Sequence, residues 1–377
     1  MMLSKLMPVV AITALSLVVS LFLMTPLAWS SDTTPLQLDL PQPAGCHSIG
    51  TRTFVLRDPR RTRDLLVTLW YPAEEGKSTV APYMDKKTAD AVAKDWKLTP
   101  DFERHVRTHA RLQAHIAAAG PFPIVFLEHG SGVVPASYTV LAEALSSTGF
   151  IVVAINHIPD SLIAVFPDGH EVRFTPYWPV DADRRTQGVA IGKFAEDVLV
   201  ADVRFVLDRL EKMAQQDVFW RGDLDLSRVG IVGHSMGGTT AALATKEDPR
   251  ILAGVNLDGS TFPGMNGDVR PIELHKPFLF IMTEEHAANE TRGREYAGKE
   301  SNTYYVVIPG TDHMSFTDAH LMSSRFAREP AIDNSLEFGR ALLATGVATS
   351  LVTEFFCKYL QNGSAPHLDL PAVVERK

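Results

Sequence analysis

Short apolar runs recur along this chain, separated by segments with a different spacing of polar positions. The runs predict strands at residues 53–56, 65–71, 124–128, 151–156, 229–233, 253–257, 278–283 and 304–308. From the third run onward the segments are apolar throughout, which is typical of parallel strands covered on both faces. The first two runs have no helix between them and are joined by a charged turn at 58–61, so they predict a hairpin.

Helices are predicted between the later runs. Segment 136–147 stops just before Gly149, segment 189–213 carries apolar residues at helical spacing, and segment 336–360 forms a C-terminal helix. Eight strands alternating with helices predict a single α/β domain at 51–377, built on a mostly parallel, doubly wound sheet. A proline-rich, extended arm is expected before it, at 31–50.

Two long insertions interrupt this alternation. Residues 72–121 are expected to be partly helical, at 89–96 and 102–119, and residues 157–186 carry aromatic side chains among prolines. Loops of this length usually cover or shape a site, so we expect both to be walls of the substrate pocket. His105, His109 and His115 lie in the first insertion, where the neighbouring arginines favour a solvated basic helix over a metal site.

The N-terminus is typical of an export signal. Lys5 precedes an apolar stretch at 7–24, and a small-residue site predicts cleavage after Ser30. We therefore expect a signal peptide at 1–30 and export to the periplasm or the exterior, with an uncleaved membrane anchor as the alternative. In an exported protein, the two cysteines, Cys46 and Cys357, predict one disulfide; two buried free thiols are the alternative.

Composition excludes several classes of function. Of the 377 residues, 45% are hydrophobic, which provides ample core for a globular protein and argues against disorder. The formal net charge of -8 argues against binding to nucleic acid. Neither a phosphate-cradling nor a dinucleotide-binding glycine pattern occurs, so no nucleotide cofactor is expected, and no metal.

The strongest chemical signal is Gly233-His234-Ser235-Met236-Gly237, directly after an apolar run. It predicts a strand that turns sharply into a helix, with the hydroxyl of Ser235 exposed at the turn. Such a hydroxyl needs a base that is itself oriented by an acid, in the chain order serine, acid, histidine. His313 follows the last predicted strand and is the expected base, because ligands bind at the carboxyl ends of the strands in such sheets.

Three residues compete for the role of the acid. Asp258 ends the otherwise apolar run at 253–257, where a carboxylate is costly unless it has a partner. Glu284 and Glu285 follow the next run, in a polar segment typical of solvent exposure. We favour Asp258 and leave the glutamates open. Backbone N–H groups of Met236 and Ser131 are the expected donors to the oxyanion, since Ser131 lies in a glycine-flexed turn after the strand at 124–128.

The chain resembles the platelet-activating-factor acetylhydrolase family of the plasma, or group VII, type, in its bacterial branch. The resemblance spans about residues 54–316 and rests on the stretches Leu127–Gly132, Gly149–His157, Gly233–Gly238, Leu257–Gly259 and Gly310–Phe316. It implies an α/β-hydrolase fold with cap-like insertions, Asp258 as the acid, and calcium-independent hydrolysis of esters with short or oxidised acyl chains.

The resulting hypothesis is an exported serine ester hydrolase without a cofactor, acting on a small-molecule or lipid ester. A peripheral contact with lipid and the oligomeric state are left open. Alternatives within enzymes are a cutinase-like polyester hydrolase, whose serine motif is similar, and a peptidase or amidase. From another class, the fold could serve as a catalytically idle binding module.

Overall fold

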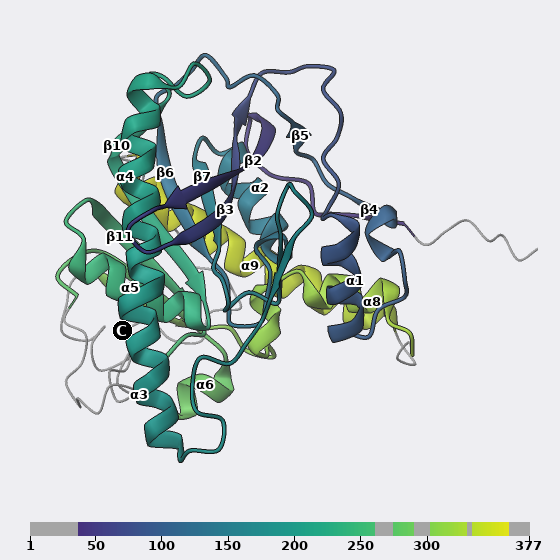
Figure 1. The fold of residues 1–377 in the computed structure, drawn as a ribbon. Helices are drawn as coiled ribbons and strands as arrows, with labels where there is room; N and C mark the ends of the chain where they lie inside the picture. Colours follow the sequence, from purple (N-terminus) through teal and green to yellow (C-terminus); the bar gives the residue numbers. More distant parts are fainter. Residues whose placement is uncertain (1–36, 261–273, 290–301, 330–333, 362–377) are drawn as a thin grey trace, which may run out of the picture. The chain divides into compact units, whose positions relative to one another are not determined.

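The computed structural model describes residues 37–260, 274–289, 302–329 and 334–361. Nine strands in this part of the chain form one sheet in the order β13-β12-β11-β10-β6-β7-β3-β2-β5 (Figure 1). Their bounds are β2 (Ser48–Asp58), β3 (Arg63–Ala73), β5 (Arg111–Leu112), β6 (Phe122–Glu128), β7 (Ile151–Asn156), β10 (Leu224–His234), β11 (Ile251–Leu257), β12 (Phe278–Met282) and β13 (Thr303–Val307). All eight predicted strands are present, and β5 is an additional edge strand.

Strand directions follow the predicted pattern. β2 and β3 form an antiparallel hairpin, paired from Ser48 opposite Ala73 to Asp58 opposite Arg63. β3 is also antiparallel to β7, whereas β7, β6, β10, β11, β12 and β13 run parallel to one another. Because the carboxyl ends of these parallel strands meet at one edge of the sheet, the loops that follow β6, β10, β11 and β13 converge there.

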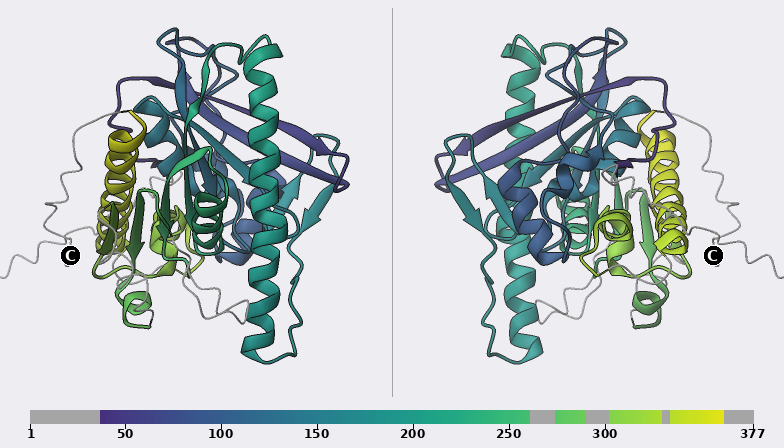
Figure 2. Two further views of the ribbon diagram at one scale, coloured as in Figure 1. Left: turned by 90° about the vertical axis from the view of Figure 1, so that its left-hand side faces the viewer. Right: turned by 90° about the vertical axis from the view of Figure 1, so that its right-hand side faces the viewer.

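Helices cover both faces of the sheet, and Figure 2 shows the long helix of residues 184–216 on the opposite side from α9. One face packs against α3 (Arg184–Phe194), the π-helical segment η3 (Ala195–Val200), α4 (Ala201–Gln216) and α5 (Met236–Glu247). The other packs against α2 (Thr139–Ser147) and α9 (Asn334–Leu360). In β6, Ile124 and Phe126 lie in the first core, and Val125 and Leu127 lie in the second. Continuous burial of the strand thus reflects two covered faces.

By length and composition, α9 is the one described helix that could cross a membrane. In this fold it is a core helix, because Leu351, Val352, Phe355 and Phe356 are buried against the sheet. The predicted signal peptide or anchor at 1–30 lies outside the described residues.

Shorter elements complete the described chain. They are β1 (Leu38–Asp39), α1 (Lys86–Asp95), η1 (Phe102–His105), β4 (Val106–Arg107), η2 (Pro135–Tyr138), β8 (Ile163–Val165), β9 (Glu171–Arg173), α6 (Glu284–Asn289), η5 (His313–Phe316) and α8 (Ala319–Phe326). Within the segment expected to be an arm, Leu38 and Leu40 are buried in a third apolar cluster, and β2 already begins at Ser48.

The predicted helix at 102–119 is wrong. Only the turn η1 is helical, and β4 and β5 follow it. The reason lies in α2, where Glu143 accepts hydrogen bonds from the His109 and Ala110 amides at 2.8 and 2.7 Å. The hydrogen-bonding requirement of both amides is therefore satisfied without a helix. His109 is also not part of a solvated basic helix, because its Nδ1 lies 2.8 Å from Glu143 Oε2.

The predicted disulfide is also wrong, since Cys46 and Cys357 are both free thiols. Cys46 is exposed and lies between two residues whose amides bond to Ser147, at the end of α2. Cys357 instead packs from α9 against the second core, where burial raises the pKa of its thiol. Each cysteine thus lies in a segment with contacts of its own, and the two thiols are not bonded to each other.

Candidate active site

The segment around Ser235 has the predicted strand-turn-helix form. β10 ends at His234, α5 begins at Met236, and Ser235 between them has φ 56° and ψ -117°. Such a backbone is strained for a residue with a side chain, and strain of this kind clusters at functional sites. The turn needs glycine on both sides: a Cβ at Gly233 would lie 2.0 Å from the Gly237 carbonyl oxygen, and one at Gly237 would lie 2.2 Å from that of Glu128.

Asp258 and His313 lie together beside this turn. Asp258 directly follows β11, and His313 begins η5 after β13. His313 Nδ1 is 2.7 Å from Asp258 Oδ2, so the ring donates its Nδ1–H to the carboxylate and leaves Nε2 to act as a base. Among the described contacts, no hydrogen bond joins His313 to Ser235. Catalytic hydrogen bonds are often long before substrate binds.

Asp258 remains ionised despite its burial. Its side chain is only 3% exposed, and burial favours the neutral form. Hydrogen bonds from His286, His313 and the Thr283 amide outweigh that effect, so the pKa of Asp258 lies well below its usual range. His286 Nδ1 stands 3.5 Å from Asp258 Oδ1, which gives this carboxylate a second histidine that the sequence analysis missed. The carboxylate is thus held negative at the place where an imidazolium would form.

The competing residues have other contacts. Glu284 accepts a hydrogen bond from the Gly310 amide at 3.0 Å and is exposed, and Glu285 is exposed as well. His320, the next histidine along the chain after His313, lies in α8, 2.7 Å from Asp312, whose side chain caps the short helix that begins at His313. Neither glutamate is a described partner of the His313 ring.

The two expected oxyanion donors lie on either side of the turn. Met236 N–H is in the first turn of α5, and Ser131 N–H is in the loop after β6. Within residues 37–260 and the other described ranges, neither amide has a protein acceptor. The loop is fixed by Asp160, which accepts from Ser131 Oγ at 2.6 Å through its side chain and from the Gly132 amide at 2.8 Å through its carbonyl. Residues of the second insertion therefore hold the loop that carries Ser131.

A chain of buried charges under this loop was not predicted. His157 Nε2 lies 2.5 Å from Glu128, and His157 Nδ1 lies 3.0 Å from Asp202. Asp202 in turn pairs with Arg61 at 2.7 Å and with Arg63 at 2.8 Å. From the sequence, the two arginines predict only a charged turn. Their partner Asp202 lies about 140 residues away in α4, so local spacing carries no signal for this contact.

Three fully buried histidines near the site differ in charge. Burial lowers the pKa of His129 and of His234 to about 3, so both rings are neutral. Burial also opposes the charge of His157, but Glu128 and Asp202 outweigh it and raise the pKa of His157 to about 9. His157 is therefore positively charged inside the protein.

These shifts predict a stability maximum near the ordinary histidine pKa of about 6.5. Below about pH 6.5, His129 and His234 bind protons in the unfolded chain but not in the fold, so the free energy of unfolding falls as the pH drops. Charged His157 stabilises the fold below about pH 6.5, and this contribution is lost as the pH rises through about 9. Urea unfolding over this range checks the expectation. H157Q should flatten the alkaline side alone, whereas a wild-type stability that rises steadily through pH 9 would contradict it.

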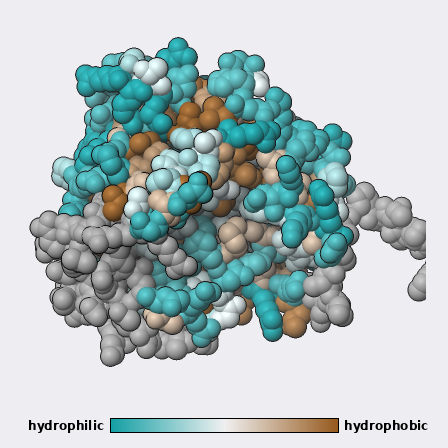
Figure 3. Space-filling view, turned by 60° about the horizontal axis from the view of Figure 1, so that its bottom comes forward, coloured by the Kyte–Doolittle hydropathy of each residue, from teal (hydrophilic) through white to brown (hydrophobic). Residues whose placement is uncertain are grey.

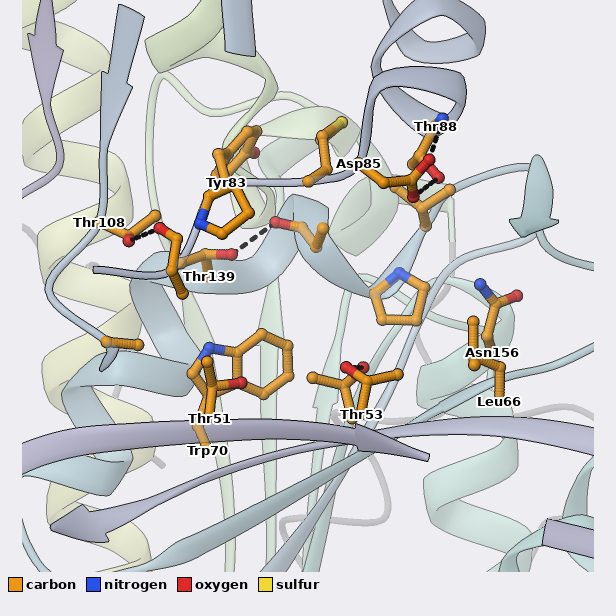
Figure 4. Close-up of a pocket in the computed structure, with 18 of the residues that line it drawn as sticks. Thr51, Thr53, Leu66, Trp70, Tyr83, Asp85, Thr88, Thr108, Thr139 and Asn156 are labelled. Carbon is orange, nitrogen blue, oxygen red and sulfur yellow. Dashed lines mark hydrogen bonds between the residues drawn. The ribbon is translucent and has the colours of Figure 1, made fainter. Parts of the chain in front are cut away.

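A cavity of about 450 Å³ lies on the α2 side of β2 and β3 (Figure 4). Both long insertions contribute to it, the first through Tyr83 and Thr108 and the second through Phe166. Its lining contains neither Ser235 nor the other two residues of the predicted triad. Figure 3, in which the bottom of the view of Figure 1 comes forward, shows apolar residues gathered among hydrophilic ones on this face.

Comparison with known proteins agrees with this geometry. A family model described as platelet-activating factor acetylhydrolase, isoform II, matches residues 36–169 and 193–368. The platelet-activating factor acetylhydrolase of Cavia porcellus is 27% identical over 282 residues, covering 69% of this chain and 62% of that protein. The corresponding protein of Bos taurus is 23% identical over 320 residues, covering 77% and 70%. The chain thus spans about three fifths of the Cavia porcellus relative.

A solved structure is similar over most of both chains. The ferulic acid esterase from Streptomyces cinnamoneus aligns with a TM-score of 0.70 and 29% identity, covering 89% of this chain and 96% of that one. The bacterial branch named above stays a prediction. The sheet order, the strained turn at Ser235 and these likenesses agree, and the chain belongs to the platelet-activating factor acetylhydrolase, isoform II, family, with the α/β-hydrolase fold.

Proposed function

We propose that this protein is an exported serine hydrolase of carboxylic esters with short acyl chains, and that Ser235, His313 and Asp258 form its catalytic triad. The observation that carries the proposal is the 2.7 Å contact between His313 Nδ1 and the buried Asp258 carboxylate, beside a serine on a strained turn. Support for ester chemistry comes from relatives named as acetylhydrolases and esterases.

The proposed reaction uses only this chain's own groups and water. Ser235 Oγ attacks the ester carbonyl carbon while His313 Nε2 takes the hydroxyl proton. The carbonyl oxygen becomes an oxyanion, to which the N–H groups of Met236 and Ser131 donate. His313 then gives the proton to the departing alcohol, which leaves an acyl group on Ser235. Water, activated by the same imidazole, releases the acid.

One observation favours a second substrate class, the esters of aromatic acids. The ferulic acid esterase structure is covered over 96% of its length, against 62% for the Cavia porcellus relative. An ester of a bulky aromatic acid is therefore the second candidate. A panel of p-nitrophenyl acetate, butyrate and octanoate, methyl ferulate, and a 1-alkyl-2-acetyl phosphocholine lipid separates the two. We expect the highest kcat/KM for the acetyl esters, and a preference for methyl ferulate would favour the aromatic class.

Labelling by a fluorophosphonate tests whether the site is active at all. We expect one label per chain, on the peptide that contains Ser235, with loss of esterase activity in parallel with labelling. The reason is that only a serine activated by a base attacks the phosphorus quickly. Native protein that remains unlabelled, under conditions where a known serine esterase reacts, would support the idle binding module instead.

A further inference from the structure

We propose that Tyr138 and His234 are positioning residues that join the loop carrying Ser131 to the loop carrying His313. This inference rests on the proposed function, and it assigns a role to two residues outside the triad. Tyr138 ends the turn η2 before α2, and His234 is the last residue of β10, next to the nucleophile.

The hydrogen bonds between these loops have fixed directions. The Gly130 N–H donates to Tyr138 Oη at 2.9 Å, so this oxygen is an acceptor there. Its own proton then goes to His234 Nδ1, which lies 2.8 Å away. With Nδ1 accepting, neutral His234 carries its proton on Nε2 and donates it to the His313 carbonyl oxygen at 2.8 Å. One chain of three hydrogen bonds therefore runs from the Gly130 amide to the backbone of the base.

Burial makes every bond in this chain costly to lose. Tyr138 is 2% exposed and His234 is 1% exposed. Burial also raises the pKa of Tyr138 and lowers that of His234, so the hydroxyl keeps its proton and the ring stays neutral. A buried donor or acceptor that loses its partner also loses access to water. The directions of the three bonds are thus the same throughout the neutral pH range.

Both ends of this chain lie at reacting positions. Gly130 directly precedes Ser131, and a Cβ built at Gly130 would lie 3.2 Å from Ser235 Cβ, so the loop packs closely on the nucleophile. At the other end, the carbonyl that His234 holds belongs to His313 itself. Errors of about 1 Å in such positions can cost about 100-fold in rate. Tyr138 and His234 thus set the distance between the loop that carries Ser131 and the base.

The variant Y138F tests this role, because it removes only one hydroxyl. We expect kcat for p-nitrophenyl acetate to fall roughly 10- to 100-fold, with KM changed less than about twofold. The matched control is Y71F. Tyr71 is also fully buried and its hydroxyl also donates a hydrogen bond, to the Ala114 carbonyl at 2.8 Å and not to a ring nitrogen, but it lies in the other core. We expect Y71F to keep its kcat. Both variants should lose a few degrees of Tm, with the larger loss in Y138F because its hydroxyl makes two buried hydrogen bonds and that of Tyr71 makes one. Equal kcat in Y138F and Y71F would overturn the proposal.

Variants of His234 test the second link and do not depend on Y138F folding. A glutamine amide reaches the place of Nε2, and an asparagine amide reaches that of Nδ1, so H234Q and H234N each keep one branch of the chain. We expect both to lose more than about tenfold in kcat. Adding Y138F to H234Q should cost less than about twofold further, because residues in one network are not additive. Wild-type kcat in folded H234N, or fully additive losses in the double variant, would overturn the proposal.

Fluorophosphonate labelling distinguishes a wrong positioning role for Tyr138 and His234 from a wrong proposed function. If wild-type Ser235 is labelled and Y138F has wild-type kcat, the triad stands and the positioning role is wrong. If wild-type Ser235 is never labelled, the proposed function is wrong, and the positioning role of Tyr138, which rests on it, is wrong as well.

Discussion

S235A is expected to lose at least 10³-fold in kcat on p-nitrophenyl acetate, and as much as about 10⁶-fold, because members of a triad act as a unit. Without Oγ, neither the buried Asp258 nor His313 has a nucleophile to activate. Binding of substrate does not need the hydroxyl, so KM should change little. Purified protein, assayed at several enzyme concentrations to exclude a contaminating esterase, gives the measurement.

A matched control for S235A is S324A. Ser324 is also buried, and its hydroxyl bonds to the Leu321 carbonyl at 2.8 Å within α8, not to any of Ser235, Asp258 or His313. We expect S324A to keep its activity within about twofold, as for a substitution that touches no catalytic contact. More than a tenth of wild-type activity in S235A would place the nucleophile elsewhere.

D258N should lose roughly 10⁴-fold in kcat, the size of effect known for replacing the orienting aspartate of a serine triad. The amide would present N–H to His313 Nδ1 and favour the tautomer whose Nε2 already carries a proton. Such a ring cannot accept the proton of Ser235. We therefore expect the buried ionised carboxylate, with its lowered pKa, to be required both for the tautomer and for the imidazolium that follows.

The glutamates supply the control for D258N. E284Q should leave kcat within about twofold, because Glu284 is exposed and contacts the Gly310 amide, not the His313 ring. E285Q should behave in the same way. A crippled E284Q beside an active D258N would reverse the assignment of the acid, and Tm measured on all three variants shows whether each is folded.

Local patterns predicted the strands and the turn at Ser235 because the chemistry there is short-range. A buried strand needs a continuous apolar run, and a sharp turn needs glycine where a Cβ would collide with backbone, as at Gly233 and Gly237. Each of these requirements concerns residues within a few positions of one another in the sequence. The order of the acid and the base along the chain adds one more constraint, which is why Asp258 and His313 could be named together.

Contacts between distant segments could not be predicted in the same way. The sequence around the amides of residues 109 and 110 predicts a helix. In the structure both amides instead donate to Glu143, more than 30 residues later. Tyr138 is 96 residues from His234, and neither the polarity nor the spacing of its own segment distinguishes it from an ordinary helix start. Contacts of this kind depend on which strands become neighbours, which a single sequence does not reveal.

The strand order has a consequence for how the protein assembles. In the nine-stranded sheet, the strands from residues 48–156 form one continuous block, β5, β2, β3, β7 and β6. β10 to β13 form a second block, which pairs with the first only between β6 and β10. The amide of Ser131 comes from the earlier block, whereas the proposed nucleophile, acid and base come from the later one. On the proposed mechanism, turnover requires both blocks to be paired, so the recovery of esterase activity during refolding should report the docking of the two halves rather than the formation of either.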